Sequence, residues 1–196
     1  AVGAGTQDEE FPFFREFWIE APEAHNDRAT IYALLDSRSV TGAFRFELFP
    51  GADSVFEVRA TLFPRVANVK FGYAPLTSMF LFSEKNRAKF DDYRPNVHDS
   101  DGLMIHRRDG DMLWRPLNNP PRLAGSYFGE ENPRSFGLYQ RDRDFANYQD
   151  VAAQYQRRPS VRVEPVGDWG KGSVRLVEIP TDLEVNDNIV AFWVPE

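Results

Sequence analysis

The sequence predicts an all-β protein, an antiparallel β-sandwich with one short helix. Three observations lead to this prediction. In the clearest segments apolar residues alternate with polar ones at a period of two, which is typical of strands with one solvated face. Such segments occur in pairs separated by turn residues. The 14 Pro and 13 Gly are spread among the turns rather than gathered in a linker.

Two pairs of segments predict β-hairpins. In the first, Ala43–Leu48 and Phe56–Leu62 alternate apolar and polar residues on either side of the turn Pro50–Ser54. In the second, Leu103–His106 and Met112–Leu117 flank a turn that contains Asp109-Gly110. This dipeptide is favoured where a tight hairpin requires positive φ angles.

Further short β-rich segments are bounded by Gly, Pro and Asn. They are Thr30–Leu35, Leu76–Phe82, Phe136–Arg141, Ser160–Glu164, Ser173–Ile179 and Asn188–Val194. One segment, Tyr148–Arg158, is predicted to be helical, because its apolar residues fall on one face and Pro159 follows it.

We expect residues 1–196 to form a single β-sandwich region, since the sequence contains no internal repeat or linker. The closing segment Ile189–Val194 is apolar at nearly every position, as expected of a strand covered on both faces. The chain stops two residues later. We therefore expect it to be a fragment of a larger domain, and the isolated fragment to aggregate or dimerise through exposed strand edges.

The composition narrows the function classes. The formal net charge is −7, with 23 Lys and Arg against 30 Asp and Glu, and no basic run of five or more. This argues against binding to nucleic acids or anionic membranes, which depends on basic patches. The longest apolar stretches are too short for a membrane span of about 20 residues. The absence of Cys removes disulfides and thiolate chemistry.

The densest polar cluster is Phe90–Gly102, which contains four Asp, one His and one Arg in 13 positions. One interpretation is a loop that delivers a catalytic acid, His98 or Asp99, beside groups that shift its pKa. Glycoside hydrolysis uses two carboxylates in this way. The other interpretation is a solvated turn in which Asp99–Gly102 caps the strand that begins at Leu103.

Metal binding by the same cluster is the weaker hypothesis. Asp99-x-Asp101-Gly102 matches only part of a calcium-binding loop, which also needs a third early acid and a closing Glu. His98 and His106 could join Asp99 as metal ligands, but their spacing matches no zinc motif. We therefore predict no metal site and no cofactor. The chain also lacks the G-x-S-x-G, GxGxxG and P-loop motifs.

Aromatic residues next to polar ones form a second theme. Sugars present apolar C–H faces ringed by hydroxyls, so a sugar-binding cleft needs flat aromatic surfaces edged by hydrogen-bonding groups. Most aromatic residues are expected in the core, and Trp114 and Trp169 are the best exceptions. The acidic and basic run Gln140–Asp144 is interpreted as an ion-paired rim or strand end rather than a catalytic dyad.

Taken in order, several motifs resemble those of the osmoregulated periplasmic glucan biosynthesis proteins G and D. The resemblance runs from about Phe11 to the end of the chain. The matching segments are Phe13–Trp18, Ala74–Phe80, Tyr93–Pro95, His98–Ser100, Trp114–Pro120, Arg143–Phe145, Trp169–Gly172 and Asn186–Val190.

The resemblance implies an exported bacterial protein of the periplasm whose signal peptide lies outside this chain. It implies action on the β-1,2-linked glucose backbone of periplasmic glucans, by an inverting endo-β-1,2-glucanase. The family's general acid lies on the His-Asp-Ser motif, which corresponds here to Asp99, with His98, Arg94 and Tyr93 as its first supports. The resemblance also implies that this chain is the later part of a large β-sandwich domain.

One position departs from the family pattern. The family commonly has Glu three residues before the acid, and this chain has Asn96. A Glu could raise the pKa of the acid or pass a proton, whereas Asn can only form hydrogen bonds. Two alternatives to hydrolysis therefore stay open: a glucan transglycosylase, and a non-catalytic glucan-binding or biosynthesis accessory protein.

The predicted site comprises three groups of residues. They are the catalytic pair Asp99 and His98, the supporting residues Tyr93, Arg94, Asn96 and Asp101, and the glucan-binding residues Tyr73, Trp114, Arg115, Tyr127 and Trp169. An inverting pair needs a second acid about 6.5–9.5 Å away, so that a water molecule fits between them. The candidates are Asp8, Glu10, Glu16 and Asp144.

Overall fold

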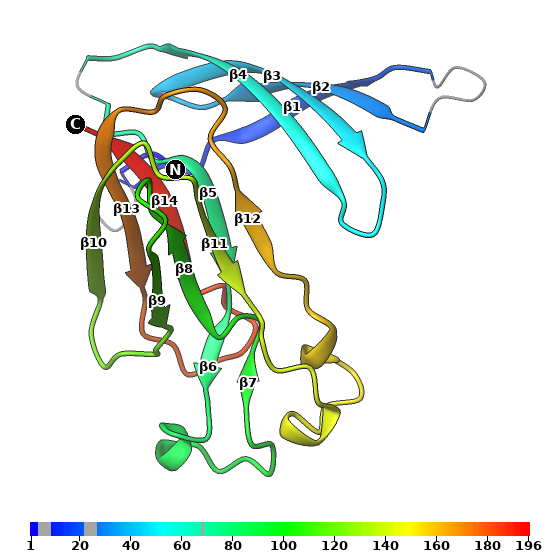
Figure 1. Cartoon of the computed structure of the whole chain (residues 1–196), viewed down its shortest axis with the longest axis vertical. Coiled ribbons are helices and arrows are strands. Elements are labelled where there is room, and N and C mark those ends of the chain that lie inside the picture. The colour runs from blue at the N-terminus through cyan, green and yellow to red at the C-terminus, as the bar shows by residue number, and fades with distance from the viewer. Residues whose placement is uncertain (4–8, 22–26, 68) are drawn as a thin grey trace. The chain divides into compact units, whose positions relative to one another are not determined.

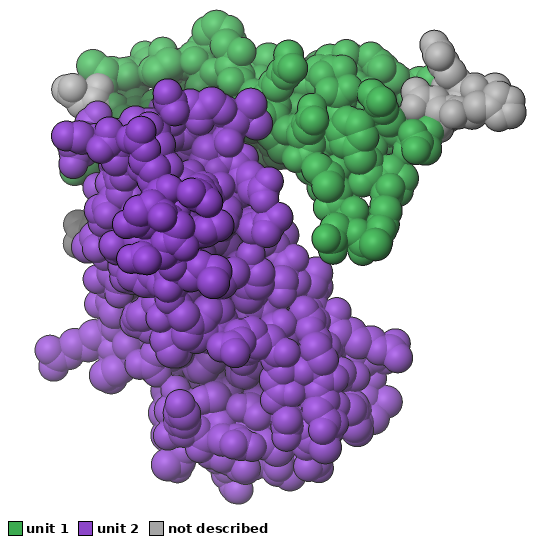
Figure 2. Space-filling view, viewed as in Figure 1, with its two compact units in different colours: residues 1–71 green, residues 72–196 purple. Residues whose placement is uncertain are grey.

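The computed structural model describes residues 1–3, 9–21, 27–67 and 69–196. The chain divides into two compact units, Ala1–Phe71 and Gly72–Glu196, which Figure 2 shows in separate colours. In the described part of the chain, no helix has the length and apolar character needed to cross a membrane. The expectation that residues 1–196 form a single sandwich region stays a prediction, and the units are described one at a time.

The first unit is a four-stranded antiparallel meander in which the strands follow one another in chain order (Figure 1). Its strands are β1 (Phe13–Ile19), β2 (Ala29–Asp36), β3 (Val40–Phe49) and β4 (Val55–Pro64). The strands β3 and β4 pair in the predicted hairpin register, with Phe44 opposite Ala60 and Phe46 opposite Val58.

The two faces of this meander differ in chemistry. One row across the sheet joins Phe17, Ala33, Phe44 and Ala60, and the next rows on the same face are equally apolar. The opposite face carries Arg45 beside Arg59 and Glu47 beside Glu57. Since side chains alternate between faces along a strand, the period of two in the sequence produces this division directly.

The second unit contains a β-sandwich and an additional pair of short strands. One sheet has the order β10-β13-β14-β5, and the other has the order β12-β11-β8-β9. The strands are β5 (Tyr73–Ser78), β6 (Phe80–Phe82), β7 (Val97–His98), β8 (Gly102–His106), β9 (Met112–Pro116), β10 (Ala124–Glu131), β11 (Ser135–Tyr139), β12 (Val161–Val163), β13 (Lys171–Glu178) and β14 (Ile189–Pro195).

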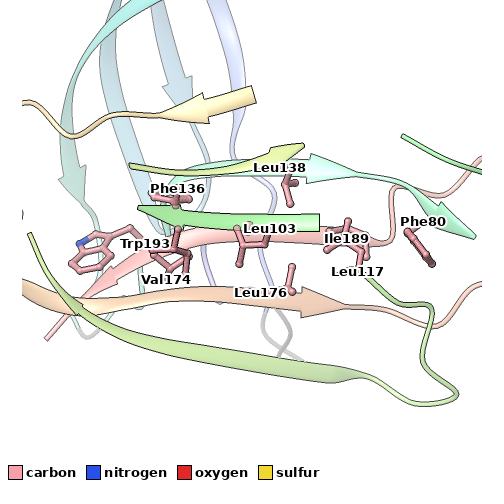
Figure 3. Packing of buried hydrophobic residues seen from close by; sticks show 11 residues of the cluster. Phe80, Leu103, Leu117, Phe136, Leu138, Val174, Leu176, Ile189 and Trp193 are labelled. Carbon is pink, nitrogen blue, oxygen red and sulfur yellow. The ribbon is translucent and has the colours of Figure 1, made fainter. Parts of the chain in front are cut away.

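The main core lies between the two four-stranded sheets of this unit (Figure 3). Leu103 on β8 and Phe136 on β11 come from one sheet, and Val174, Leu176 and Ile189 come from the other. All five are fully inaccessible to solvent. The predicted all-β sandwich is therefore confirmed, and the burial of apolar side chains between its sheets is its main source of stability.

A second apolar cluster lies beneath the loops around β6 and β7. It comprises Met79, Leu81, Phe82, Val97, Tyr148 and Tyr155. The two tyrosines come from the segment that contains the 3₁₀ turns η2 (Phe145–Asn147) and η3 (Tyr155–Arg157), which lies near β6 and β7 in Figure 1. This cluster provides the polar loops with a rigid apolar base.

Most predicted strands are present, with four differences. The segment Leu76–Phe82 is divided into β5 and β6 at Met79. Three strands were not predicted. Aromatic and charged residues obscure the alternation in β1 and β10, and the two-residue β7 lies within the segment interpreted as a polar loop. In the β8–β9 hairpin, Gly110 has the expected positive φ of 103°.

The predicted helix over Tyr148–Arg158 is wrong. The segment forms turns and the short η3 instead, because Gln149 and Gln154 have φ angles of 55° and 49°. Such left-handed residues interrupt a right-handed helix. The carboxylate of Asp150 accepts hydrogen bonds from the backbone of Ala152 and Ala153, a turn arrangement that competes with helix formation.

The side chain of Asn188 joins β6 to the residue that follows β13. Its Oδ1 accepts from the backbone N–H of Phe80 at 2.8 Å, and its Nδ2 donates to the carbonyls of Phe80 and Ile179, both at 3.0 Å. Asn188 is 2% exposed, so water cannot replace these bonds.

We expect Asn188→Ala in the full-length protein to lower the free energy of unfolding. The substitution leaves the buried amide of Phe80 without this partner, which costs about 1–3 kcal/mol. Urea denaturation measures the change. The control Asn118→Ala removes an exposed side chain and should change stability by about 0.5 kcal/mol or less. Equal effects of the two substitutions would contradict the prediction.

Candidate active site

The backbone fixes the position of Asp99 at the end of β7. This strand pairs with β6, with His98 opposite Phe80. The amide of Asp99 donates to the carbonyl of Met79 at 2.8 Å. Two residues later, the amide of Asp101 donates to Tyr139 at 2.7 Å, and its carbonyl accepts from Leu117 at 2.8 Å. The loop His98–Gly102 is therefore held on both sides by strands of the second unit.

The carboxyl group of Asp99 is half-buried, with a side chain that is 25% exposed. Its Oδ1 lies 3.1 Å from Nε of Arg158. Burial raises the pKa of Asp99; the nearby positive charge of Arg158 opposes this effect, and the negative charge of Asp187 adds to it. A carboxyl group with a raised pKa that still reaches solvent can hold a proton and deliver it to a ligand.

His98 lies under the loop, inside the apolar base. Its ring stacks on Phe80 at 5.1 Å between centroids and meets the edge of Tyr148 at 5.4 Å. Its side chain is 3% exposed, and its Nε2 is 3.6 Å from Oδ1 of Asp101. Burial lowers the pKa of His98, with Asp101 opposing, so the imidazole is neutral at pH 7. This placement suits a residue that positions Asp99 rather than one that contacts a ligand.

Asp101 holds the next loop in place. Its Oδ2 accepts hydrogen bonds from the backbone amides of Arg141 and Asp142. In turn, the carboxylate of Asp142 accepts from the amide of Asp144 at 3.0 Å and from Nδ2 of Asn147 at 2.7 Å. The acidic residues of the run Gln140–Asp144 therefore bind backbone and side-chain N–H groups, in a rim stabilised mainly by hydrogen bonds rather than by the expected ion pairs.

Arg94 connects three segments through carboxylates. Its guanidinium is 2.7 Å from Asp92, 2.6 Å from Asp150 and 2.8 Å from Glu184. The hydrogen bonds to Asp92 are the main reason that the pKa of Arg94 is raised, and they lower the pKa of Asp92. Tyr93 is 73% exposed and donates to the carbonyl of Gln149 at 3.2 Å. Both residues therefore order the rim of the site.

Asn96 uses both ends of its amide. Its Oδ1 accepts from the backbone N–H of Glu84 at 3.0 Å, and its Nδ2 donates to the carbonyl of Asn147 at 2.8 Å. The side chain is buried. A carboxylate at this position would direct a lone pair at the Asn147 carbonyl instead of a donor. In this chain, Asn96 thus forms a connection between two loops that requires an amide.

The predicted glucan-binding residues fall in different parts of the second unit. The ring of Trp114 packs on Gly102, leaving no room there for a Cβ, and Arg141 lies 5.0 Å from its centroid. Arg115, opposite Leu103 on β8, is 2.8 Å from the buried carboxylate of Glu178. Trp114 itself lies opposite Met104 in the middle of β8, and only its ring reaches the first residue of that strand.

Of the other three predicted glucan-binding residues, Tyr73 and Tyr127 lie in the other four-stranded sheet, and Trp169 precedes β13 of that sheet. Tyr73 pairs with Trp193, at the opposite end of β5 from Ser78, and Trp169 packs 6.1 Å from Trp193. Tyr127 is 65% exposed on β10, with Arg175 5.1 Å from its ring. The structure therefore places the Trp114 ring beside the Asp99 loop, turns Arg115 toward Glu178 of the other sheet, and puts Tyr73, Tyr127 and Trp169 at or next to that other sheet. Their roles in binding stay predictions.

Two of the four candidates for the second acid already have local roles. Glu10 accepts from the backbone and hydroxyl of Ser39, and hydrogen bonds from Ser37 and Ser39 lower its pKa to about 2. Asp144 is the N-cap of η2 and accepts from Ala146. Glu16 is exposed on β1, and Asp8 lies outside the described residues. The second acid stays a prediction.

Sequence reasoning missed several residues that shape the site. Arg158 and Asp187 affect the charge of Asp99, and Gln140 donates to the carbonyls of His98 and Tyr155 at 3.0 and 3.1 Å. The Asn186–Val190 motif signalled Asp187, but Arg158 was interpreted only as the end of a helix. Among the described residues, no group of three or more His, Asp or Glu side chains is arranged to hold a metal ion.

The comparisons with known proteins place the chain in a family. Residues 1–196 match the family model described as "Periplasmic glucan biosynthesis protein, MdoG". The chain therefore belongs to this family. The resemblance found in the sequence motifs is confirmed over the whole chain.

Among its relatives, the chain is 66% identical to Glucans biosynthesis protein G of Cereibacter sphaeroides, over 100% of the chain and 36% of that protein. It is 57% identical to the protein of the same name from Pseudomonas paraeruginosa, over 96% of the chain and 36% of the relative. Glucans biosynthesis protein G 1 of Shewanella oneidensis is 54% identical, over 98% of the chain and 35% of the relative. The chain thus spans about a third of the length of these relatives.

We expect Asn96→Asp in the full-length protein to lower stability by about 1–3 kcal/mol at pH 7, because a buried donor is replaced by an acceptor. The loss should diminish as the pH falls. Burial and the facing carbonyl raise the pKa of the new carboxyl group above its unfolded value, so its destabilising effect is present at high pH and vanishes once it is protonated. Unfolding experiments measure this dependence from about pH 4, close to the ordinary Asp pKa, up to about pH 8.

The matched control for this prediction is Asn118→Asp. Asn118 is exposed, and its Oδ1 accepts from Asn86, a role that a carboxylate can also fill. The control makes the same change in charge and should leave stability nearly unchanged. A loss for Asn96→Asp that is equal to that of the control, or independent of pH, would contradict the structural role of Asn96.

Proposed function

We propose that the full-length protein acts in periplasmic glucan biosynthesis, in the periplasm, as an endo-acting enzyme on β-1,2-linked glucan. In this proposal the present chain supplies the general acid, Asp99. The family match and the printed names of the relatives support the glucan context. The single observation that carries the catalytic assignment is the half-buried carboxyl of Asp99, whose pKa is raised mainly by burial.

The proposed reaction is an inverting hydrolysis. The carboxyl O–H of Asp99 gives its proton to the glycosidic oxygen while the bond from that oxygen to the anomeric carbon breaks. A water molecule forms the new bond to the anomeric carbon from the opposite face and loses its proton to the second acid. One water is consumed, and each cleavage produces one new reducing end.

The surrounding residues support this role by holding Asp99 in place. The stacked ring of His98 and the backbone bond to Met79 restrict the loop, and Arg94 and Asp101 tie neighbouring loops to it. Rigid placement matters because proton transfer requires the acid within about 2.6–3.2 Å of the glycosidic oxygen. Trp114 and Arg141 provide a flat aromatic and cationic surface close to the same loop, suited to the C–H face and hydroxyls of a glucose unit.

One observation favours a second candidate function. The amide of Asn96 is engaged with two backbone groups and cannot titrate, so this position provides no proton relay. A protein that activates water poorly would transfer the cleaved chain to a sugar hydroxyl, as a transglycosylase, or would only bind the glucan. The products distinguish these candidates.

We expect Asp99→Asn in the full-length protein to lower turnover of linear β-1,2-glucan by about 10²- to 10⁴-fold, the contribution typical of general acid catalysis. Glucan affinity should be retained, since the amide has nearly the same size and shape. Reducing-end release and product length measure turnover, and calorimetry measures affinity.

The matched control is Asp168→Asn, at an exposed position, which should leave turnover unchanged. Unchanged turnover in Asp99→Asn would contradict the assignment of the acid. New products without new reducing ends in the wild-type protein would identify a transglycosylase, and binding without any product would identify an accessory protein.

A further inference from the structure

The contact between Arg158 and Asp99 does not favour the protonated form of Asp99 that a general acid needs. Nε of Arg158 is 3.1 Å from Oδ1 of Asp99. This oxygen is buried and accepts no hydrogen bond from any described residue, so the contact is one of charge rather than of aligned donor and acceptor. An arginine beside a carboxyl group favours its ionised form, whereas the proposed reaction starts from the protonated form.

Arg158 is also less constrained than Arg94. The side chain of Arg94 is 13% exposed and is bound by three carboxylates, whereas that of Arg158 is 44% exposed and pairs with Asp99. The guanidinium of Arg158 lies 5.6 Å from the centroid of the Tyr155 ring. Its backbone carbonyl accepts from Arg143. The main chain is therefore held while the side chain extends toward solvent.

We propose that Arg158 is a displaceable counterion of Asp99, which pairs with the carboxylate in the free protein and moves aside when a glucan binds. This inference rests on the proposed role of Asp99 as the general acid. Arg158 is a positioning residue in this scheme: it acts through Asp99 and does not touch the reacting atoms. Once displaced, its guanidinium can donate hydrogen bonds to sugar hydroxyls while remaining near Tyr155.

The charged groups around Asp99 predict what displacement does. Arg158 is the main influence that opposes the raised pKa of Asp99, and a hydrogen bond from the backbone N–H of Met79 to the carboxyl group opposes it less. Burial and Asp187 act in the other direction. The other titratable groups nearby are already engaged or uncharged. Asp101 accepts from two backbone amides, and His98 is neutral. Glu184 is paired with Arg94 and accepts from Tyr155. Removing Arg158 therefore raises the pKa of Asp99 further, and the carboxylate takes up a proton from solvent.

The pH dependence of catalysis tests the proposal in the full-length protein. The alkaline limb of kcat/KM reports the acid in the free enzyme, and that of kcat reports it in the glucan complex. In the wild-type protein the kcat limb should lie at higher pH than the kcat/KM limb. In Arg158→Gln the kcat/KM limb should move to higher pH and approach the kcat limb, while Arg158→Lys should stay close to the wild type.

A second readout does not depend on turnover. Calorimetry of linear β-1,2-glucan binding, in buffers with different ionisation enthalpies, measures the protons taken up on binding. The measurement is made at a pH between the two limbs. If the protein binds glucan without turnover, a pH of about 5–6 is used instead, which is about one to two units above the ordinary Asp pKa. Under these conditions the wild type should take up protons. Arg158→Gln should take up fewer. The control Arg157→Gln, an exposed neighbour with the same change in charge, should behave as the wild type.

The outcomes separate this inference from the proposed function. Coincident limbs in the wild type, or equal proton uptake by the wild type and Arg158→Gln, would overturn the role of Arg158 even if Asp99→Asn abolishes turnover. A uniform loss of activity in Arg158→Gln without a shift of the kcat/KM limb would indicate a merely structural role and would also overturn it. Unchanged turnover in Asp99→Asn would reject the general acid itself.

Discussion

The candidate site depends on the burial of His98 between Phe80 and Tyr148. This packing anchors β7 on the apolar base, so that the next residue, Asp99, is placed where the base ends and solvent begins. The partial burial that results raises the pKa of Asp99, and the positive charge of Arg158 limits the effect. The chemistry proposed for this site therefore follows from where an apolar cluster ends, with charged residues adjusting the result.

Much of the fold was predictable because local sequence patterns determine it. The alternation in β3 and β4 and the Gly110 turn determine their hairpins without help from distant residues. The helix prediction for Tyr148–Arg158 failed for the opposite reason. Tyr148 and Tyr155 have helical spacing in the sequence, yet both enter the apolar cluster through turns at Gln149 and Gln154, and that packing is invisible in a local window.

The site was predictable only as far as its residues are close in sequence. Asp99, His98, Asp101 and Arg94 lie within one segment, and their density of charge and polarity identified it. Their partners come from far along the chain: Arg158 meets Asp99, and Asn147 accepts from Asn96. Asn96 illustrates the consequence, because its departure from the family pattern suggested a lost function, whereas its contacts indicate a structural role that an amide fills.

In the proposed function, Asp99 is protonated when a glucan occupies the site. Infrared difference spectroscopy of the full-length protein, with and without linear β-1,2-glucan, measures the carboxyl C=O stretch that only a protonated acid shows. We expect such a band to grow when glucan binds to the wild-type protein and the change to be absent in Asp99→Asn. Binding without this band, or the same band in Asp99→Asn, would contradict this expectation.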